Sequence, residues 1–157
     1  MKNRQWPASV PDGDWSRFLK LNVPLKDMRT RGSHIVVVPP SAVMAPFLGL
    51  SGWLECTLPA LDALTDRPII VSEKGGAPAS SLFRGAWCVI TEHSQVAIDA
   101  LIEGIPAIML SDQRRLGSLA EIENPPMSRA FFSTLANNQF TLDEMKSGDC
   151  WAALTRA

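Results

Sequence analysis

The chain has 157 residues, of which 46% are hydrophobic, and its formal net charge is −1. This length and composition predict one globular domain with a sizeable core, and the near-zero charge argues against nucleic acid as a partner. No apolar run approaches the roughly 18 residues of a membrane-spanning helix, and the scattered Cys56, Cys88 and Cys150 predict reduced, mostly buried thiols in a cytoplasmic protein without a metal site.

The first 33 residues are predicted to form an irregular, basic N-terminal arm. Prolines and glycines interrupt this segment, and residues 1–31 carry seven Lys or Arg against three Asp, which gives a local charge of +4. Such an arm is most often a solvated extension, and the alternative is that it meets an anionic partner.

Four short hydrophobic runs predict β-strands at residues 35–38, 69–72, 88–91 and 107–110. Continuous β-branched runs are typical of strands buried on both faces, as in parallel sheets. Helical spacing of apolar residues predicts one helix at 52–64, with a kink or a late start at Pro59, and a second at 95–103, with Gly104 as its stop.

This alternation of strands and helices indicates the α/β class with right-handed crossovers. If the two helices cover opposite faces, a parallel sheet of about four strands results, in the order 2-1-3-4. We therefore predict a single Rossmann-like domain over residues 34–157, with helices on both faces and a helical tail at 113–157. In that tail, helices are expected at 116–122, at 129–136 and from Thr141 onward, where Thr141 and Glu144 form a capping-box pattern.

Polar residues interrupt the hydrophobic pattern after the first and the third predicted strand. Ligands of open α/β sheets bind beyond the carboxyl ends of the strands, where the strand order reverses. Ser41 follows the first strand, and Ser94 precedes the second helix and is placed to cap it. The amides at Gln95 then predict an anion site at this helix terminus, although a capping serine alone is structural in most proteins.

Three further residues are candidates for ligand contact. Asp99 shares a polar stripe with Gln95, and it either faces water or accepts hydrogen bonds from the hydroxyls of a sugar. Lys74 lies on a glycine-rich loop and could clamp a phosphate. His93 is expected to contact phosphate, and the alternative is an acid/base pair with Glu92.

The pattern Ser94-x4-Asp99-Ala100-Leu101-x2-Gly104-Ile105-Pro106 resembles the nucleotide-binding motif of GT-B glycosyltransferases. It is most similar to the group of capsule-polysaccharide, Kdo-transferase-like and bacterial sialyltransferase enzymes, in which a Ser/Thr cluster opens a helix that continues Glu-Ala-Leu-x-x-Gly-x-Pro. The resemblance covers about residues 34–110. Residues 122–145 are similar to the tails of short phage or environmental glycosyltransferase-like proteins.

The resemblance implies that Ser94 meets the donor phosphate and that Asp99 occupies the ribose-binding position, with Asp shorter than the family's Glu by one methylene. Lys74 and Pro78 lie where the group carries Lys-x-His-Pro, and the histidine of that pattern is missing. The implied function is a nucleotide-sugar-binding domain in glycan or polysaccharide biosynthesis, acting without a metal and with no cofactor besides the donor.

GT-B enzymes close two Rossmann-like domains over their substrates, and this chain resembles only the donor-binding one. A partner chain or a second copy of the chain would supply the acceptor half, or catalysis has been lost. The alternatives are a non-catalytic interaction module and a regulatory domain that binds another phosphorylated metabolite.

Overall fold

The computed structural model describes residues 15–155 apart from 73–75, 77, 112–114 and 128–129. By its internal contacts the chain divides into two compact units, where composition and length predict one domain. We call residues 24–127 the sheet unit, and residues 1–23 together with 128–157 the terminal unit. Each unit is described by itself.

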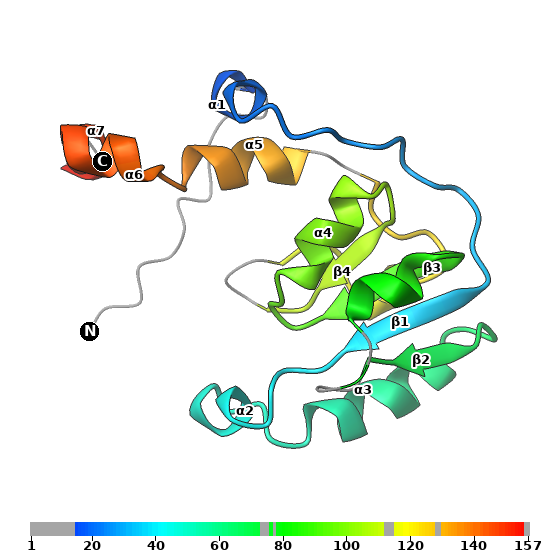
Figure 1. The fold of residues 1–157 in the computed structure, drawn as a ribbon. Coiled ribbons are helices and arrows are strands. Elements are labelled where there is room, and N and C mark those ends of the chain that lie inside the picture. Colours follow the sequence, from blue (N-terminus) through cyan, green and yellow to red (C-terminus); the bar gives the residue numbers. More distant parts are fainter. Residues whose placement is uncertain (1–14, 73–75, 77, 112–114, 128–129, 156–157) are drawn as a thin grey trace. The chain divides into compact units, whose positions relative to one another are not determined.

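The sheet unit contains the predicted parallel sheet, and its strand order β2-β1-β3-β4 confirms the expected topology (Figure 1). All three strand pairs are parallel, and the pairing of Val36 with Ile70 and with Val89 illustrates the register around the central strand. The strands are β1 (His34–Val38), β2 (Ile69–Val71), β3 (Ala86–Thr91) and β4 (Ala107–Met109).

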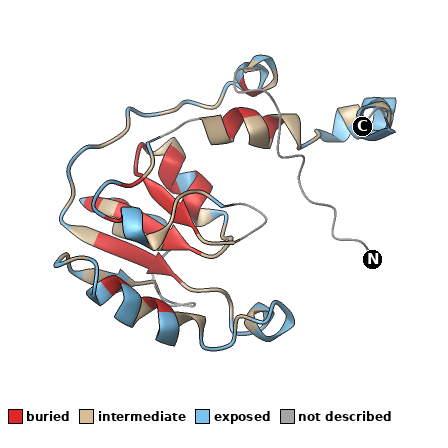
Figure 2. Ribbon diagram, turned by 180° about the vertical axis from the view of Figure 1, so that it is seen from behind, coloured by how far each residue is buried: buried red, intermediate tan, exposed pale blue. Residues whose placement is uncertain are grey.

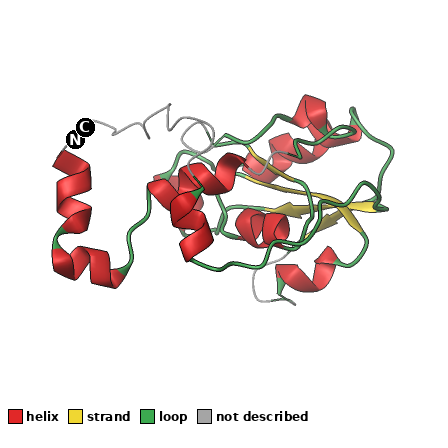
Figure 3. Cartoon of the chain, turned by 90° about the horizontal axis from the view of Figure 1, so that it is seen from above, coloured by secondary structure: helices red, strands yellow, loops and turns green. Residues whose placement is uncertain are grey.

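Helices lie on both sides of this sheet (Figure 3). The elements between and after the strands are α2 (Met44–Phe47), α3 (Trp53–Asp62), the 3-10 helix η1 (Ala79–Phe83), α4 (Val96–Ile102) and the 3-10 helix η2 (Leu119–Glu121). The strands are buried along almost their whole length, except for the half-exposed edge strand β2 (Figure 2).

Side chains alternate along each strand and so form a core on each face of the sheet. On the α3 side, Ile35 and Val37 pack with Leu61 of α3 and with Ile90 and Ile108. Cys88 lies in the same cluster, where burial raises the pKa of its thiol far above the usual value. Cys56 is exposed and Cys150 half-buried, so the expectation of mostly buried thiols holds for Cys88 alone.

Residues 26–29, which we call the strap, form backbone hydrogen bonds at the C-terminal end of α4. The amide of Lys26 donates to the carbonyl of Ile102 (2.9 Å) and that of Arg29 to the carbonyl of Gly104 (2.7 Å). Gly104 has the predicted left-handed conformation, with φ +76°, and a Cβ there would lie 2.1 Å from the Asp27 carbonyl oxygen. The glycine therefore serves both the helix stop and the close approach of the strap.

Several predicted elements differ from the structure. The helix expected at 116–122 is only the short η2, because Leu116 instead forms an antiparallel bridge with Met109. The helix α3 begins at Trp53, before Pro59, so the proline does not delay its start. The short helix α2 has no counterpart in the sequence prediction.

The regular structure described in the terminal unit is helical. It contains α1 (Ser16–Lys20), α5 (Ala130–Asn137), α6 (Leu142–Ser147) and α7 (Asp149–Thr155), so part of the arm predicted to be irregular is a helix. Phe18 of α1 stacks near Phe132 of α5, with ring centroids 5.2 Å apart. The capping box at Thr141 and Glu144 is confirmed, and Gly148, with φ +87°, separates the last two helices.

Arg17 joins α1 to the C-terminal helices of this unit. Its guanidinium donates to the Glu144 carboxylate (2.6 Å) and to the carbonyls of Ala136 and Gln139. The bonds from Arg17 to the Glu144 carboxylate, followed by the bond from the Thr141 amide, lower the pKa of Glu144 from 4.5 to about 2. Over the described residues, no helix is long and apolar enough to cross a membrane.

Replacing Gly104 with Ala should destabilise the sheet unit far more than replacing Gly148. Both glycines have positive φ, but a Cβ at Gly148 meets nothing within 4 Å, whereas one at Gly104 overlaps the Asp27 carbonyl. We expect a loss of about 3 kcal/mol at Gly104 and about 1 kcal/mol at Gly148, measured by urea unfolding. Equal losses would contradict the tight contact between strap and helix.

Replacing Glu144 with Gln should lower the urea midpoint of the helical signal at near-neutral pH. A carboxylate whose pKa is lowered on folding stabilises the fold above its ordinary pKa, and it loses that contribution as the pH falls through the folded value. The difference between the two proteins should therefore vanish as the pH falls from 4.5 to about 2. Asp143→Asn is the control, because its contact with Lys146 is long (3.9 Å) and exposed; a pH-independent difference for Glu144→Gln would refute the role of its charge.

Candidate functional site

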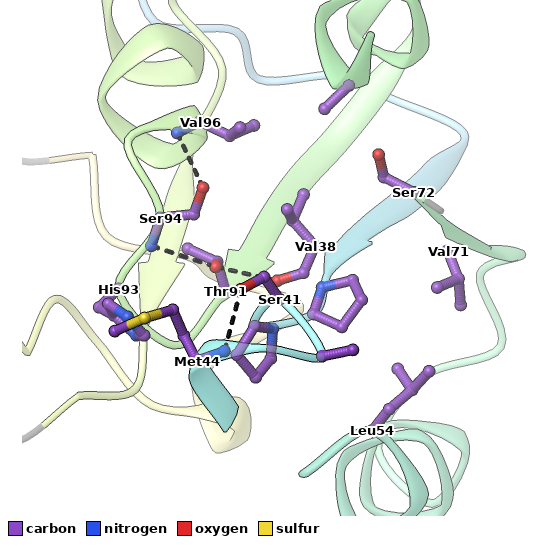
Figure 4. A pocket seen from close by; sticks show the side chains of 14 residues that line it. Val38, Ser41, Met44, Leu54, Val71, Ser72, Thr91, His93, Ser94 and Val96 are labelled. Carbon is purple, nitrogen blue, oxygen red and sulfur yellow. Dashed lines mark hydrogen bonds between the residues drawn. The ribbon is translucent and has the colours of Figure 1, made fainter. Parts of the chain in front are cut away.

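A pocket of about 700 Å³ lies at the carboxyl ends of β1, β2 and β3 (Figure 4). The chain leaves β1 toward α3 and leaves β3 toward α4, on opposite faces of the sheet, so the two loops diverge and open a crevice between them. The pocket is lined by Val38, Pro39, Pro40, Ser41, Ala42, Met44, Leu54, Val71, Ser72, Ala79, Thr91, His93, Ser94 and Val96.

Thr91 links the two sides of this pocket by hydrogen bonds. It is buried, and its hydroxyl donates to the carbonyl of Val38 at the end of β1 (2.9 Å). The same oxygen accepts a hydrogen bond from the Ser94 amide (3.3 Å). One side chain thus uses both its donor and its acceptor to hold the turn after β3 against the end of β1.

Two serine hydroxyls lie on either side of the switch point, one in each loop. The Ser41 hydroxyl accepts a bond from the Met44 amide (3.2 Å), and the Ser94 hydroxyl accepts one from the Val96 amide (3.3 Å). Each hydroxyl therefore acts as an acceptor toward the backbone, and neither donates to a residue that the structure describes. Both protons are available to a ligand in the pocket.

The Ser94 bond also explains how the predicted capping role is realised. α4 begins at Val96, and the serine two residues earlier accepts from the first amide of the helix. The Val96 amide is therefore already occupied. An anion would meet the serine hydroxyls rather than the Val96 amide, which is one of the two amides that the sequence suggests.

The remaining predicted site residues are only partly brought together. His93 is half-buried and lines the pocket, as do Ser41 and Ser94. Gln95 and Asp99 are exposed and are not part of the lining. Lys74 lies outside the described residues.

Glu92 has a structural partner. Its carboxylate accepts a hydrogen bond from Nε1 of Trp53 (2.7 Å), and its backbone carbonyl accepts one from the Ser111 amide (3.0 Å). Glu92 is also absent from the described lining of the pocket, although His93 is part of it. The alternative in which Glu92 and His93 act as an acid/base pair gains no support from this arrangement.

Sequence reasoning missed the apolar walls of the pocket. Val38, Leu54 and Val71 come from three different elements, and Met44 comes from the unpredicted α2. No local signal marks such residues, because each reads as an ordinary core side chain. Among the residues the structure describes, no group of three or more His, Cys, Asp or Glu is placed to hold a metal ion.

Comparison of the chain with protein-family models, with curated proteins and with solved structures gave no match. The geometry of the pocket is therefore the basis for a functional proposal.

Replacing Thr91 with Val should destabilise the sheet unit by about 2 kcal/mol, because the Val38 carbonyl and the Ser94 amide both lose a partner next to the core. Thr155→Val is the control, since the Thr155 hydroxyl bonds only within exposed α7. Urea unfolding measures both changes. A Thr91→Val protein as stable as the wild type would show that the two loops are held together by other contacts.

Proposed function

We propose that the sheet unit binds a nucleotide sugar, as the donor-binding domain of a glycosyltransferase-like protein in glycan or polysaccharide biosynthesis. One observation carries the proposal: Ser41 and Ser94 line the same pocket at the switch point, and both have hydroxyl protons not used by the described residues. Hydroxyl groups that donate to a phosphate oxygen form charge-assisted hydrogen bonds, which are stronger than neutral ones.

The size and composition of the pocket support a ligand with both polar and apolar parts. Its volume of about 700 Å³ is within the range of about 300–1,000 Å³ that is usual for small-molecule sites. The serine hydroxyls and His93 would meet the phosphates, while Val38, Leu54 and Val71 offer an apolar surface to the rest of the ligand. A few polar groups beside a larger apolar surface are typical of small-molecule and cofactor sites.

Asp99 enters the proposal as a contact beyond the pocket itself. Val96 lines the pocket, and Asp99 follows three residues later on the same helix. Residues three apart in a helix are neighbours on one face. A sugar hydroxyl of a ligand that extends along α4 would reach the Asp99 carboxylate, which agrees with the role that the GT-B resemblance implies.

The pocket alone supports binding better than catalysis. Among its described lining residues, His93 is the one titratable side chain. Sugar transfer needs an acceptor site and a general base, which in this proposal come from a second copy of the chain or from a partner chain. The same observation favours the second candidate function, a non-catalytic domain that binds a phosphorylated metabolite. A cytoplasmic location belongs to either proposal, because the three thiols are unpaired.

Titration calorimetry with CMP-, UDP- and GDP-sugars, and with inorganic phosphate, tests the proposal. Ser41→Ala and Ser94→Ala should each weaken the bound nucleotide sugar about tenfold, the effect of losing one hydrogen bond to a charged group. Ser118→Ala is the matched control, because that hydroxyl bonds to Glu121 outside the pocket. Urea midpoints of the variants separate a loss of contact from a loss of fold.

The outcomes separate the two candidate functions. Binding of a nucleotide sugar that depends on both serines supports the donor site, and release of free nucleotide on addition of an acceptor would support transfer. Binding of inorganic phosphate alone would favour the metabolite-binding domain. Affinities unchanged by both substitutions would remove the pocket from consideration.

A further inference from the structure

The chain between β1 and α3 exposes a cluster of apolar side chains beside the pocket. Residues 39–54 contain no charged residue. We call residues 42–52, which include α2, the rim segment. Its exposed apolar side chains are Val43 (65% exposed), Met44 (46%), Phe47 (83%) and Leu48 (46%). Four such side chains on one short segment leave apolar surface exposed to water next to the pocket.

Hydrogen bonds anchor this segment next to both of its ends, on the two sides of the pocket. On the β1 side, the hydroxyl of Ser41 accepts from the Met44 amide (3.2 Å) and its carbonyl accepts from the Ala45 amide (2.8 Å). On the β3 side, Trp53 donates to Glu92 in the turn that carries His93 and Ser94. The segment therefore joins the two loops whose serines line the pocket.

The middle of the segment is not buried and is held together by its own backbone hydrogen bonds. None of the four residues of α2 is buried. Local bonds, such as the one from the Leu50 amide to the Ala45 carbonyl (2.8 Å), keep the turn together. Gly49 and Gly52 have φ of +70° and +77°, and a Cβ at Gly49 would meet nothing within 4 Å. A Cβ at Gly52 would lie 4.0 Å from the Glu55 carboxylate. A hinge between the turn and α3 would fall at these two glycines, because glycine adopts left-handed conformations without strain.

We propose that the rim segment is a lid that folds over the pocket and brings Phe47 against its apolar wall. Met44 already lines the pocket, so one residue of the segment contacts the pocket before the segment closes. Closure buries the exposed side chains and removes water from the serine hydroxyls, which strengthens their bonds to an anion. That a phosphorylated ligand favours the closed position rests on the proposed function, whereas the closing motion itself does not.

Disulfide trapping tests the motion without any ligand. Phe47→Cys and Ser72→Cys are combined with Cys56→Ser and Cys150→Ser, which leaves Cys88 in the core. Ser72 lines the pocket at the end of β2 (Figure 4). The control pairs Phe47→Cys with Ser33→Cys, an exposed position just before β1, at the opposite end of the sheet.

The pair at residues 47 and 72 should oxidise to an intramolecular disulfide at least about tenfold faster than the control pair, because the bond needs Cα atoms within about 7 Å. Loss of two hydrogens in the mass spectrum of the intact monomer reports it. Equal rates for the two pairs would overturn the lid.

Titration with UDP and with inorganic phosphate then tests closure over a ligand. Phe47→Ser should weaken UDP about tenfold and should weaken phosphate as well, because closure strengthens the serine bonds to any anion, while Leu142→Ser, another highly exposed apolar position in the terminal unit, should change neither. Unchanged UDP affinity in the Phe47→Ser protein would refute a lid that closes on the ligand. If the wild type binds another of the nucleotide sugars named above instead of UDP, that ligand takes the place of UDP in this titration. If it binds none of them, the nucleotide part of the proposed function fails, and the disulfide rates alone decide the lid.

Discussion

The hydroxyl of Thr91 joins the end of β1 to the turn after β3, at the point where the two loops diverge. Parallel strands that send their helices to opposite faces leave a gap between the loops at their carboxyl ends, and the backbone groups there lack strand partners. Thr91 donates to Val38 and accepts from Ser94, so it satisfies one group on each side of the gap. Thr91 thus holds the turn that carries His93 and Ser94 against the end of β1, beside the pocket.

The sheet could be predicted because its signals are local and agree with one another. The run Ile35–Val38 has no polar alternation, and Gly104 and Pro106 end α4. The segments between successive strands are too long for tight hairpins and long enough for crossover connections. Such features limit a parallel sheet to very few topologies. The same reasoning placed Ser41 and Ser94 at the switch point, since the carboxyl ends of adjacent parallel strands always lie at one edge.

The rest depended on contacts between residues far apart in the sequence. Trp53 and Glu92 are joined by a side-chain bond across 39 positions, and nothing in either neighbourhood indicates it. Leu116 pairs with Met109 as an added bridge, which overrides the helical spacing of the residues that follow. The exposure of the rim segment could not be predicted, because apolar residues such as Phe47 and Val43 are usual in a buried helix. Propensity cannot distinguish a buried apolar turn from one held in water beside a pocket.

The composition of the terminal unit has a consequence for synthesis of the chain. Helix α1 is made early, but its packing partner Phe132 and the carboxylate bound by Arg17 follow more than a hundred positions later. At ribosomal rates of about 5–20 residues per second, the interval is on the order of ten seconds. All of residues 24–127 emerge during that time, so the sheet can form while Phe18 still lacks its cover. The side chain of Phe18 therefore stays without its packing partner in the nascent chain until the terminal unit can assemble.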